Sequence, residues 1–292
     1  MRADATVLAA FPTRVGDLLE LTKPRITTLV VITAAVGYAV GSRGFDPATF
    51  VALLLGTAMV AGGASALNQH AERDLDALME RTRHRPLPAG RLTGGEALAF
   101  GLALSGIGIA LLATINVLTP ALGAAALASY LLLYTPLKRL TSLCTVVGAV
   151  PGAIPPMMGW AAARGTLGTG AWSLFAVLFL WQLPHFLAIG WIYREDYARA
   201  GFPMLTVLDS DGRSTGRQMM LYSAALIPVT LAAGAAATAG AGYLWSALAL
   251  GLVFFGASFR FAWTRSVAAA RVLFLISVLY LPVLLGLMVF DR

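Results

Sequence analysis

The chain has 292 residues, of which 58% are hydrophobic and 12% are charged, and its mean hydropathy is +0.78. Because a soluble domain carries about twice that share of charged residues, this composition excludes a soluble globular protein and indicates a polytopic membrane protein. The net charge of +7 would suggest nucleic-acid binding in a soluble chain, but membrane topology explains it here and we expect no nucleic-acid partner. The single cysteine, Cys144, excludes an internal disulfide and a cysteine-based metal site.

Apolar stretches of about the length that spans a bilayer recur along the whole sequence. We therefore predict an all-α fold in which nine transmembrane helices pack as one bundle and residues 1–292 form a single domain. Residues 1–22 lack a continuous apolar core, which argues against a cleaved signal peptide. The predicted spans are 24–42, 48–70, 95–115, 119–136, 142–162, 171–193, 217–239, 242–261 and 270–290.

The basic residues support this topology. With the N-terminus inside, 18 of the 21 lysines and arginines fall on the inner side, and the exceptions are Arg43, Arg164 and Arg292. Cytoplasmic loops are enriched in Lys and Arg. The split predicts a multi-pass protein of the cell (inner) membrane with a cytoplasmic N-terminus, a C-terminus outside, and the long polar loops 71–94 and 194–216 in the cytoplasm.

A polar stripe follows the second predicted span. Asn68, Glu72 and Asp76 are four residues apart, so on a helix they share one face with about 40° of drift per step. Three oxygen-bearing side chains on one face form half of a cage for a hard cation such as Mg²⁺, which completes its shell with substrate phosphates and water. The competing interpretation is a solvated juxtamembrane loop held by salt bridges.

Arginines follow the stripe directly. Arg81 and Arg85 are also four residues apart, and they precede Pro86, which we expect to end the helix. Carboxylates next to arginines suit an anionic ligand that arrives with Mg²⁺.

Two further basic groups lie at predicted helix ends. Tyr134, Lys138 and Arg139 end the fourth span, where the two cations could bind a diphosphate or could simply mark the inner side. Lys23 and Arg25 flank a proline at the start of the first span, where an interface anchor is the more ordinary role.

Two more positions could carry chemistry. Glu195 and Asp196 are adjacent and diverge on a helix, so one of them could contact a metal or both could simply be solvated. His185 follows Pro184 inside an apolar span. It could ligate a metalloporphyrin, transfer a proton, or form a plain hydrogen bond to a neighbour.

Together these motifs resemble the UbiA-type intramembrane prenyltransferases. That family carries an N-x-x-x-D-x-x-x-D motif, matched here by Asn68, Glu72 and Asp76, and a Y-x-x-x-K motif, matched by Tyr134 and Lys138. The match is closest to the branch that prenylates haem. It runs through LTKPRITTL (21–29), MERTRHRPLPAG (79–90), YTPLKR (134–139), GAVPGAIPPMMGW (148–160), WQLPHF (181–186), EDYARAGFPML (195–205) and ARVLFLISVLYLP (270–282).

The chain departs from the family pattern at two places. Glu72 stands where the family more commonly has Asp, so the carboxylate is kept on a longer stem. The second family motif, D-x-x-x-D, is a poorer match, because its ends fall on Tyr193 and Tyr197 with Glu195 and Asp196 between them.

The resemblance implies a central cavity open to the cytoplasmic side, farnesyl diphosphate and haem b as substrates, haem O as product and Mg²⁺ as cofactor. Asn68, Glu72 and Asp76 would hold Mg²⁺ and the diphosphate. Lys138 and Arg139, with Arg81 or Arg85, would neutralise the leaving group. The allylic cation would then be captured by a haem vinyl group and afterwards by water. Haem A synthase or terminal oxidase assembly factors are the partners that the family implies.

Two other functions compete with this interpretation. A related prenyltransferase could use a quinone precursor or a chlorophyll-type acceptor, with the same diphosphate site. A membrane transporter would also place charged groups near a cavity. The acids and arginines gather on one side without a charged pair at the midplane, which counts against transport.

Overall fold

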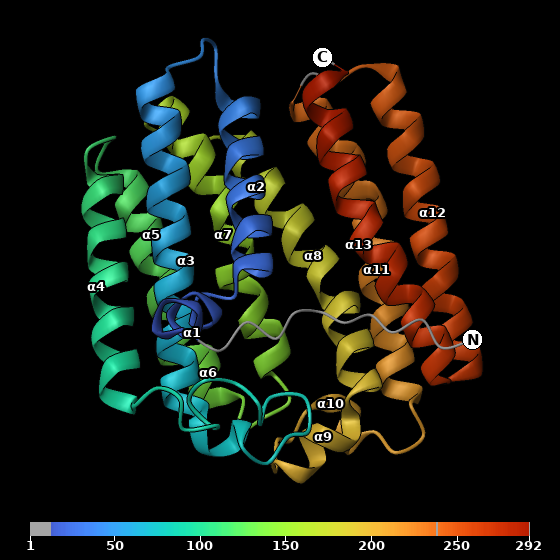
Figure 1. Ribbon diagram of the computed structural model, residues 1–292. Helices are drawn as coiled ribbons and strands as arrows, with labels where there is room; N and C mark the ends of the chain where they lie inside the picture. The colour runs from blue at the N-terminus through green and yellow to red at the C-terminus, as the bar shows by residue number, and fades with distance from the viewer. Residues whose placement is uncertain (1–12, 238, 292) are drawn as a thin grey trace, which may run out of the picture.

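The computed structural model describes residues 13–237 and 239–291, and within them every regular element is helical. The long helices run side by side in one bundle (Figure 1). Across these two ranges, nine helical segments are long and apolar enough to cross a membrane. They are α2 (Pro24–Gly41), α3 (Pro47–Asp76), α4 (Gly94–Ala113), the run of α5 (Leu118–Ala128), η1 (Ser129–Tyr134) and α6 (Thr135–Leu137), α7 (Cys144–Arg164), α8 (Thr169–Ile192), α11 (Arg213–Ala236), α12 (Ala241–Thr264) and α13 (Val267–Phe290).

The predicted all-α fold with nine spans is confirmed for the described residues, with shifts at the ends. The largest shift is at α3, which continues from the predicted end at residue 70 to Asp76. The short helices α1 (Arg14–Leu21), α9 (Arg194–Arg199) and α10 (Leu205–Leu208) lie outside the spans. The N-terminus, which we predicted to be cytoplasmic, lies outside the described residues.

One end of the bundle gathers the polar connections. The 77–93 loop, α9 and α10 lie together at that end, whereas α13 finishes at the opposite end (Figure 1). Helix α1 is tied to the same loop, because Arg91 donates to Asp17 and to Glu20, each at 2.8 Å. Gln69 on α3 donates to the carbonyl of Leu21 at 2.8 Å. These bonds fix the entrance to α2 against α3.

The polar loop is folded differently from our prediction. We expected Pro86 to end the helix, but α3 already ends at Asp76 and residues 77–93 run in turns. The hydroxyl of Thr82 donates to the carbonyl of Asp76 at 2.7 Å and helps to hold the turn. On a continued helix, Arg85 would lie about 13 Å along the axis from Asp76. The turn brings the two side chains into contact instead.

The fourth span contains a widened turn that the sequence analysis did not predict. Residues Ser129–Tyr134 form a π-helix, in which the amide of Thr135 donates to the carbonyl of Tyr130. Pro136 follows at once and has no N–H to continue the α-helical pattern. The hydroxyl of Thr135 donates to the same carbonyl at 2.9 Å. Such π-turns are frequent at functional sites, and this one carries Thr135 and Lys138 toward α3.

Glycines set the closest helix contacts. An added Cβ at Gly159 on α7 would collide with the backbone of Ala34 on α2, and one at Gly37 would collide with the backbone of Pro156. Small residues allow such close approach in lipid, where no hydrophobic effect drives helices together. The pairing of α2 with α7 therefore depends on these two positions.

We expect Gly159→Ala to destabilise the protein by about 1–3 kcal/mol, since the backbones must move apart. Thermal unfolding in detergent would measure the loss. Gly286→Ala on α13 is the control, because nothing lies within 4 Å of its added Cβ. Equal melting temperatures for the two variants would contradict this account.

Candidate active site

The polar stripe on α3 is buried. Asn68, Glu72 and Asp76 are 4%, 2% and 1% exposed, respectively. The side chain of Asp74, between the two acids on the same helix, is 87% exposed. A helix therefore separates these neighbours as its periodicity requires, and the solvated-loop interpretation is wrong for the three stripe residues.

Each stripe residue has one partner from another segment. Asn68 Nδ2 donates to Thr135 Oγ1 at 3.1 Å. Lys138 Nζ lies 2.9 Å from Glu72 Oε2. Arg85 Nη1 lies 2.7 Å from Asp76 Oδ2. The end of the fourth span and the 77–93 loop thus meet on α3.

These bonds leave one oxygen free on each stripe residue. Among the described residues, no hydrogen bond is formed by Asn68 Oδ1 or Asp76 Oδ1, and Glu72 Oε1 is buried without any partner. An orphaned buried carboxylate oxygen is costly and suits a bound cation. Within the part of the chain that the structure describes, no three or more His, Cys, Asp or Glu side chains come together to hold a metal by themselves. The donor set fits Mg²⁺, which uses few carboxylates and shares substrate phosphates and waters.

Three basic side chains, those of Lys23, Arg85 and Lys138, lie near the two carboxylates of the stripe. Burial opposes the charge of Lys138, but Glu72, Tyr197 and Tyr130 together outweigh burial and raise the pKa of Lys138. For half-buried Lys23 the outcome is opposite. Burial lowers the pKa of Lys23 to about 7, and the neighbouring cations of Arg85 and Lys138 act in the same direction. Lys23 is thus a third basic group near the two carboxylates, and a bound anion would offset the mutual repulsion of these basic side chains.

Lys23 is held in an unusual conformation. Its φ is 48°, in the left-handed region, and it immediately precedes Pro24 at the start of α2. Non-glycine residues rarely adopt this conformation, and the strain persists where the surroundings impose it. Arg25, by contrast, is exposed, so the structure brings one of these two cations near the stripe and leaves the other outside.

Arg81 lies against two tyrosines. Its guanidinium is 5.2 Å from the ring centroid of Tyr193 and 5.8 Å from that of Tyr197. Nη2 of Arg81 also donates to the Tyr197 hydroxyl at 3.4 Å. The tyrosines that stand in the D-x-x-x-D positions thus hold a cation of the 77–93 loop.

The neighbouring acids take no part in the stripe. Glu195 is exposed. Asp196 is buried, and it accepts bonds from the amide of Glu80, at 3.3 Å, and from Arg199. Burial alone would raise the pKa of Asp196, but these donors hold it below its usual value. Asp196 therefore fastens α9 to the 77–93 loop.

The remaining predicted residues are dispersed. Arg139 is exposed, donates to the carbonyl of Ala71 at 2.7 Å, and lines an open hollow of about 380 Å³. Tyr134 is half-buried and stacks on Tyr130, with ring centroids 5.3 Å apart. His185 lies on α8 against α13, where Nδ1 is 2.7 Å from Ser277 Oγ.

The sequence analysis missed Thr135 and Phe202. Thr135 fixes the Asn68 amide, and the ring of Phe202 lies 4.5 Å from Lys138 Nζ. The available signal for Thr135 was its place between Tyr134 and a proline. No sequence pattern near Phe202 predicts its role, because the folding of its loop is what brings the ring to Lys138.

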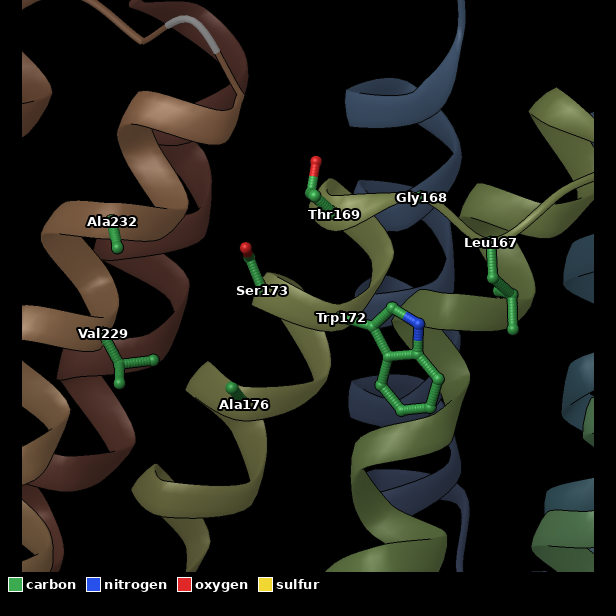
Figure 2. A pocket seen from close by; sticks show the side chains of 8 residues that line it. All are labelled: Leu167, Gly168, Thr169, Trp172, Ser173, Ala176, Val229 and Ala232. Atoms are coloured by element: carbon green, nitrogen blue, oxygen red, sulfur yellow. The ribbon is translucent and has the colours of Figure 1, made fainter.

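A larger hollow, of about 510 Å³, lies at the opposite end of the bundle. Figure 2 shows Val229 and Ala232 of α11 opposite Ser173 and Ala176 of α8, whereas the ring of Trp172 extends to the other side of α8. It is open and mostly apolar, and it contains no charged residue. Because α8 begins at this end and α3 ends at the other (Figure 1), the hollow is not part of the stripe.

We expect Lys138→Met to destabilise the protein by about 3–5 kcal/mol, because Glu72 would remain buried without a counter-charge. Chemical unfolding in detergent would measure the loss. Adding Glu72→Gln should recover most of it, since the double variant buries no unpaired charge. Two additive losses would contradict the pairing.

Comparison with known proteins agrees with the geometry. The sequence profile of the UbiA prenyltransferase family matches residues 30–280. A protein of Solibacter usitatus named protoheme IX farnesyltransferase is 49% identical, over 94% of this chain and 98% of its own length. One of Myxococcus xanthus with the same name is 44% identical, over 97% of each chain.

Solved structures share the fold at low sequence identity. A digeranylgeranylglyceryl phosphate synthase aligns with a TM-score of 0.80 at 15% identity, covering 95% of this chain and 98% of its own. A UbiA homologue from Archaeoglobus fulgidus, bound to GPP and Mg²⁺, aligns with a TM-score of 0.67 at 14% identity, covering 93% and 99%.

Proposed function

Because this chain belongs to the UbiA prenyltransferase family, we propose that it transfers a farnesyl group from farnesyl diphosphate to a vinyl group of haem b. The relatives named protoheme IX farnesyltransferase cover nearly the whole chain and support this choice of substrates. The observation that carries the proposal is the buried stripe of Asn68, Glu72 and Asp76, with three free oxygens among an excess of cations.

In this proposal, Asn68, Glu72 and Asp76 hold Mg²⁺ through their free oxygens. When bound, Mg²⁺ supplies Lewis-acid neutralisation of the diphosphate charge. Lys138 lies against Glu72 and Arg85 lies against Asp76, so a cation stands beside each carboxylate before the substrate binds. The structure of the Archaeoglobus fulgidus homologue contains both GPP and Mg²⁺, which is consistent with this assignment.

The cations stabilise the leaving group. As the bond between farnesyl C1 and oxygen breaks, the electron pair stays on the diphosphate, and Lys23, Lys138 and Arg85 neutralise the growing charge. The two residues left outside the stripe, Arg25 and Arg139, would meet the substrate only at the rim. Asp196 and Arg81 would act by holding the 77–93 loop in place.

The allylic cation needs a dry surface rich in π electrons. The stacked rings of Tyr130 and Tyr134 and the ring of Phe202 lie around Lys138 and could supply it. The vinyl π electrons then form the new carbon–carbon bond, water captures the cation left beside the porphyrin, and one proton is released. The products are haem O and diphosphate, and no protein nucleophile is required.

We place the stripe at the cytoplasmic face. The loops at its end of the bundle carry most of the basic residues, as expected for the inside of a cell membrane. The central cavity and its opening to this side are part of the proposal. A haem O product would pass to haem A synthase or to terminal oxidase assembly factors.

We expect Asp76→Asn to lower turnover by at least about a hundredfold, because removing an electrostatic element of this kind costs that much. Mg²⁺-dependent binding of farnesyl diphosphate should weaken with it. Asp74→Asn is the matched control, since it removes the same charge from an exposed position on the same helix. It should leave turnover within about twofold. Equal effects of the two variants would overturn the assignment.

The acceptor is tested by mass spectrometry of haems extracted from cells with and without the protein. We expect the hydroxyethylfarnesyl product only in cells that contain it. In membranes supplied with labelled farnesyl diphosphate, label should enter haem b rather than an aromatic acid. Label in the aromatic acid would favour the quinone-precursor alternative, and solute uptake without diphosphate release would favour a transporter.

A further inference from the structure

A second polar group lies where α8 packs on α13, away from the stripe. Ser277 on α13 is fully buried and His185 on α8 is half-buried. His185 Nδ1 lies 2.7 Å from Ser277 Oγ. An ionisable side chain inside a membrane span is usually functional, and the diphosphate chemistry of the stripe does not use this one.

The hydrogen bonds determine which imidazole nitrogen carries the proton. Ser277 Oγ lies 2.6 Å from the carbonyl of Phe274, which can only accept. The single hydroxyl proton of Ser277 is therefore donated to that carbonyl. Ser277 must then accept from His185, so the proton sits on Nδ1 and the lone pair on Nε2.

Nε2 of His185 is left without a partner. Within residues 13–237 and 239–291, Nε2 forms no hydrogen bond. The fully buried polar atoms without a partner do not include Nε2, so this nitrogen has an accessible surface. A free acceptor among apolar side chains is costly to maintain. A neutral imidazole with a hydrogen-bonded Nδ1–H and an open Nε2 is the usual arrangement of a metal-ligating histidine.

Aromatic rings fix the direction of that lone pair. The ring of His185 stacks on Trp181, with centroids 5.0 Å apart and planes 23° apart. Phe274 lies 5.1 Å away on α13, and Phe186 lies 5.8 Å away. Trp181 is itself held by a bond from Nε1 to the carbonyl of Ser277, at 2.9 Å. The imidazole is thus preorganised, and the half-exposed rings around it suit a flat apolar ligand.

The position suits the acceptor of the proposed reaction. His185 is seven residues from the end of α8 at Ile192, about 10 Å along the axis. It therefore lies deeper than Asp76, which ends α3 at the same end of the bundle. Both α3 and α8 pack on α2 and α7. The helices that carry the stripe and His185 thus pack on the same two helices.

We propose that Nε2 of His185 is the axial ligand of the haem iron in the acceptor substrate, and that Ser277 is the positioning residue that sets its tautomer. This inference rests on the proposed function, since it assigns the acceptor end of the same reaction. The iron–nitrogen bond would hold the porphyrin in one orientation while a vinyl group reacts at the diphosphate end.

The test is titration of the purified full-length protein with ferric haem b and with iron-free protoporphyrin IX. We expect His185→Ala to weaken haem binding by at least about tenfold and to change the Soret band, while protoporphyrin affinity stays within about twofold. Added imidazole should restore the spectrum. His84→Ala is the matched control, because His84 is exposed in the 77–93 loop, and it should bind haem normally.

Ser277→Ala tests the tautomer separately. It should keep haem bound but lower the iron–histidine stretching frequency of the ferrous complex, because Nδ1–H loses its acceptor. Equal losses of haem and protoporphyrin affinity in His185→Ala would show a merely structural role and overturn the inference. So would an unchanged stretching frequency in Ser277→Ala, which also decides the matter if His185→Ala fails to fold.

Failure of this inference is distinguishable from failure of the proposed function. Normal farnesyl transfer with an unchanged His185→Ala haem spectrum would overturn the ligand and leave the function standing. Histidine-ligated haem in a protein that farnesylates a different acceptor would support the ligand and overturn the function.

Discussion

The site depends on pairing two buried carboxylates with cations inside an apolar bundle. Burying each charge costs several kcal/mol unless a well-placed partner compensates it. Lys138 compensates Glu72 from the end of the fourth span, and Arg85 compensates Asp76 from the 77–93 loop. Because these partners come from separate segments, the ion pairs organise the polar end of the bundle as well as the stripe itself.

Two unusual backbone conformations place polar side chains near these ion pairs. The π-helix before Pro136 directs Thr135 toward Asn68, and the left-handed Lys23 starts α2 beside the stripe. Membrane spans tolerate such irregularities where neighbouring groups satisfy the backbone. Here the irregular segments lie next to the buried charges, where they place hydroxyl and ammonium groups that straight helices would carry elsewhere.

The stripe and the group around His185 differ in the chemistry that they can bind. The stripe offers oxygen ligands and cations at the polar end, which suits a diphosphate with Mg²⁺. The contact between α8 and α13 offers an imidazole held among aromatic rings, which suits a porphyrin. In the proposed reaction, this separation keeps the charged leaving group near water and the cationic carbon in a dry region.

The sequence by itself determined the nine spans, because hydrophobic length and the distribution of arginines are local properties. It also determined that Asn68, Glu72 and Asp76 share a face, because helical periodicity fixes that. Only the tertiary structure decided which cations join them. Lys23 and Arg85 come near the stripe while Arg25, Arg139 and Glu195 remain exposed, because the turns of residues 77–93 and the packing of α1 and α9 depend on contacts between residues far apart in the chain.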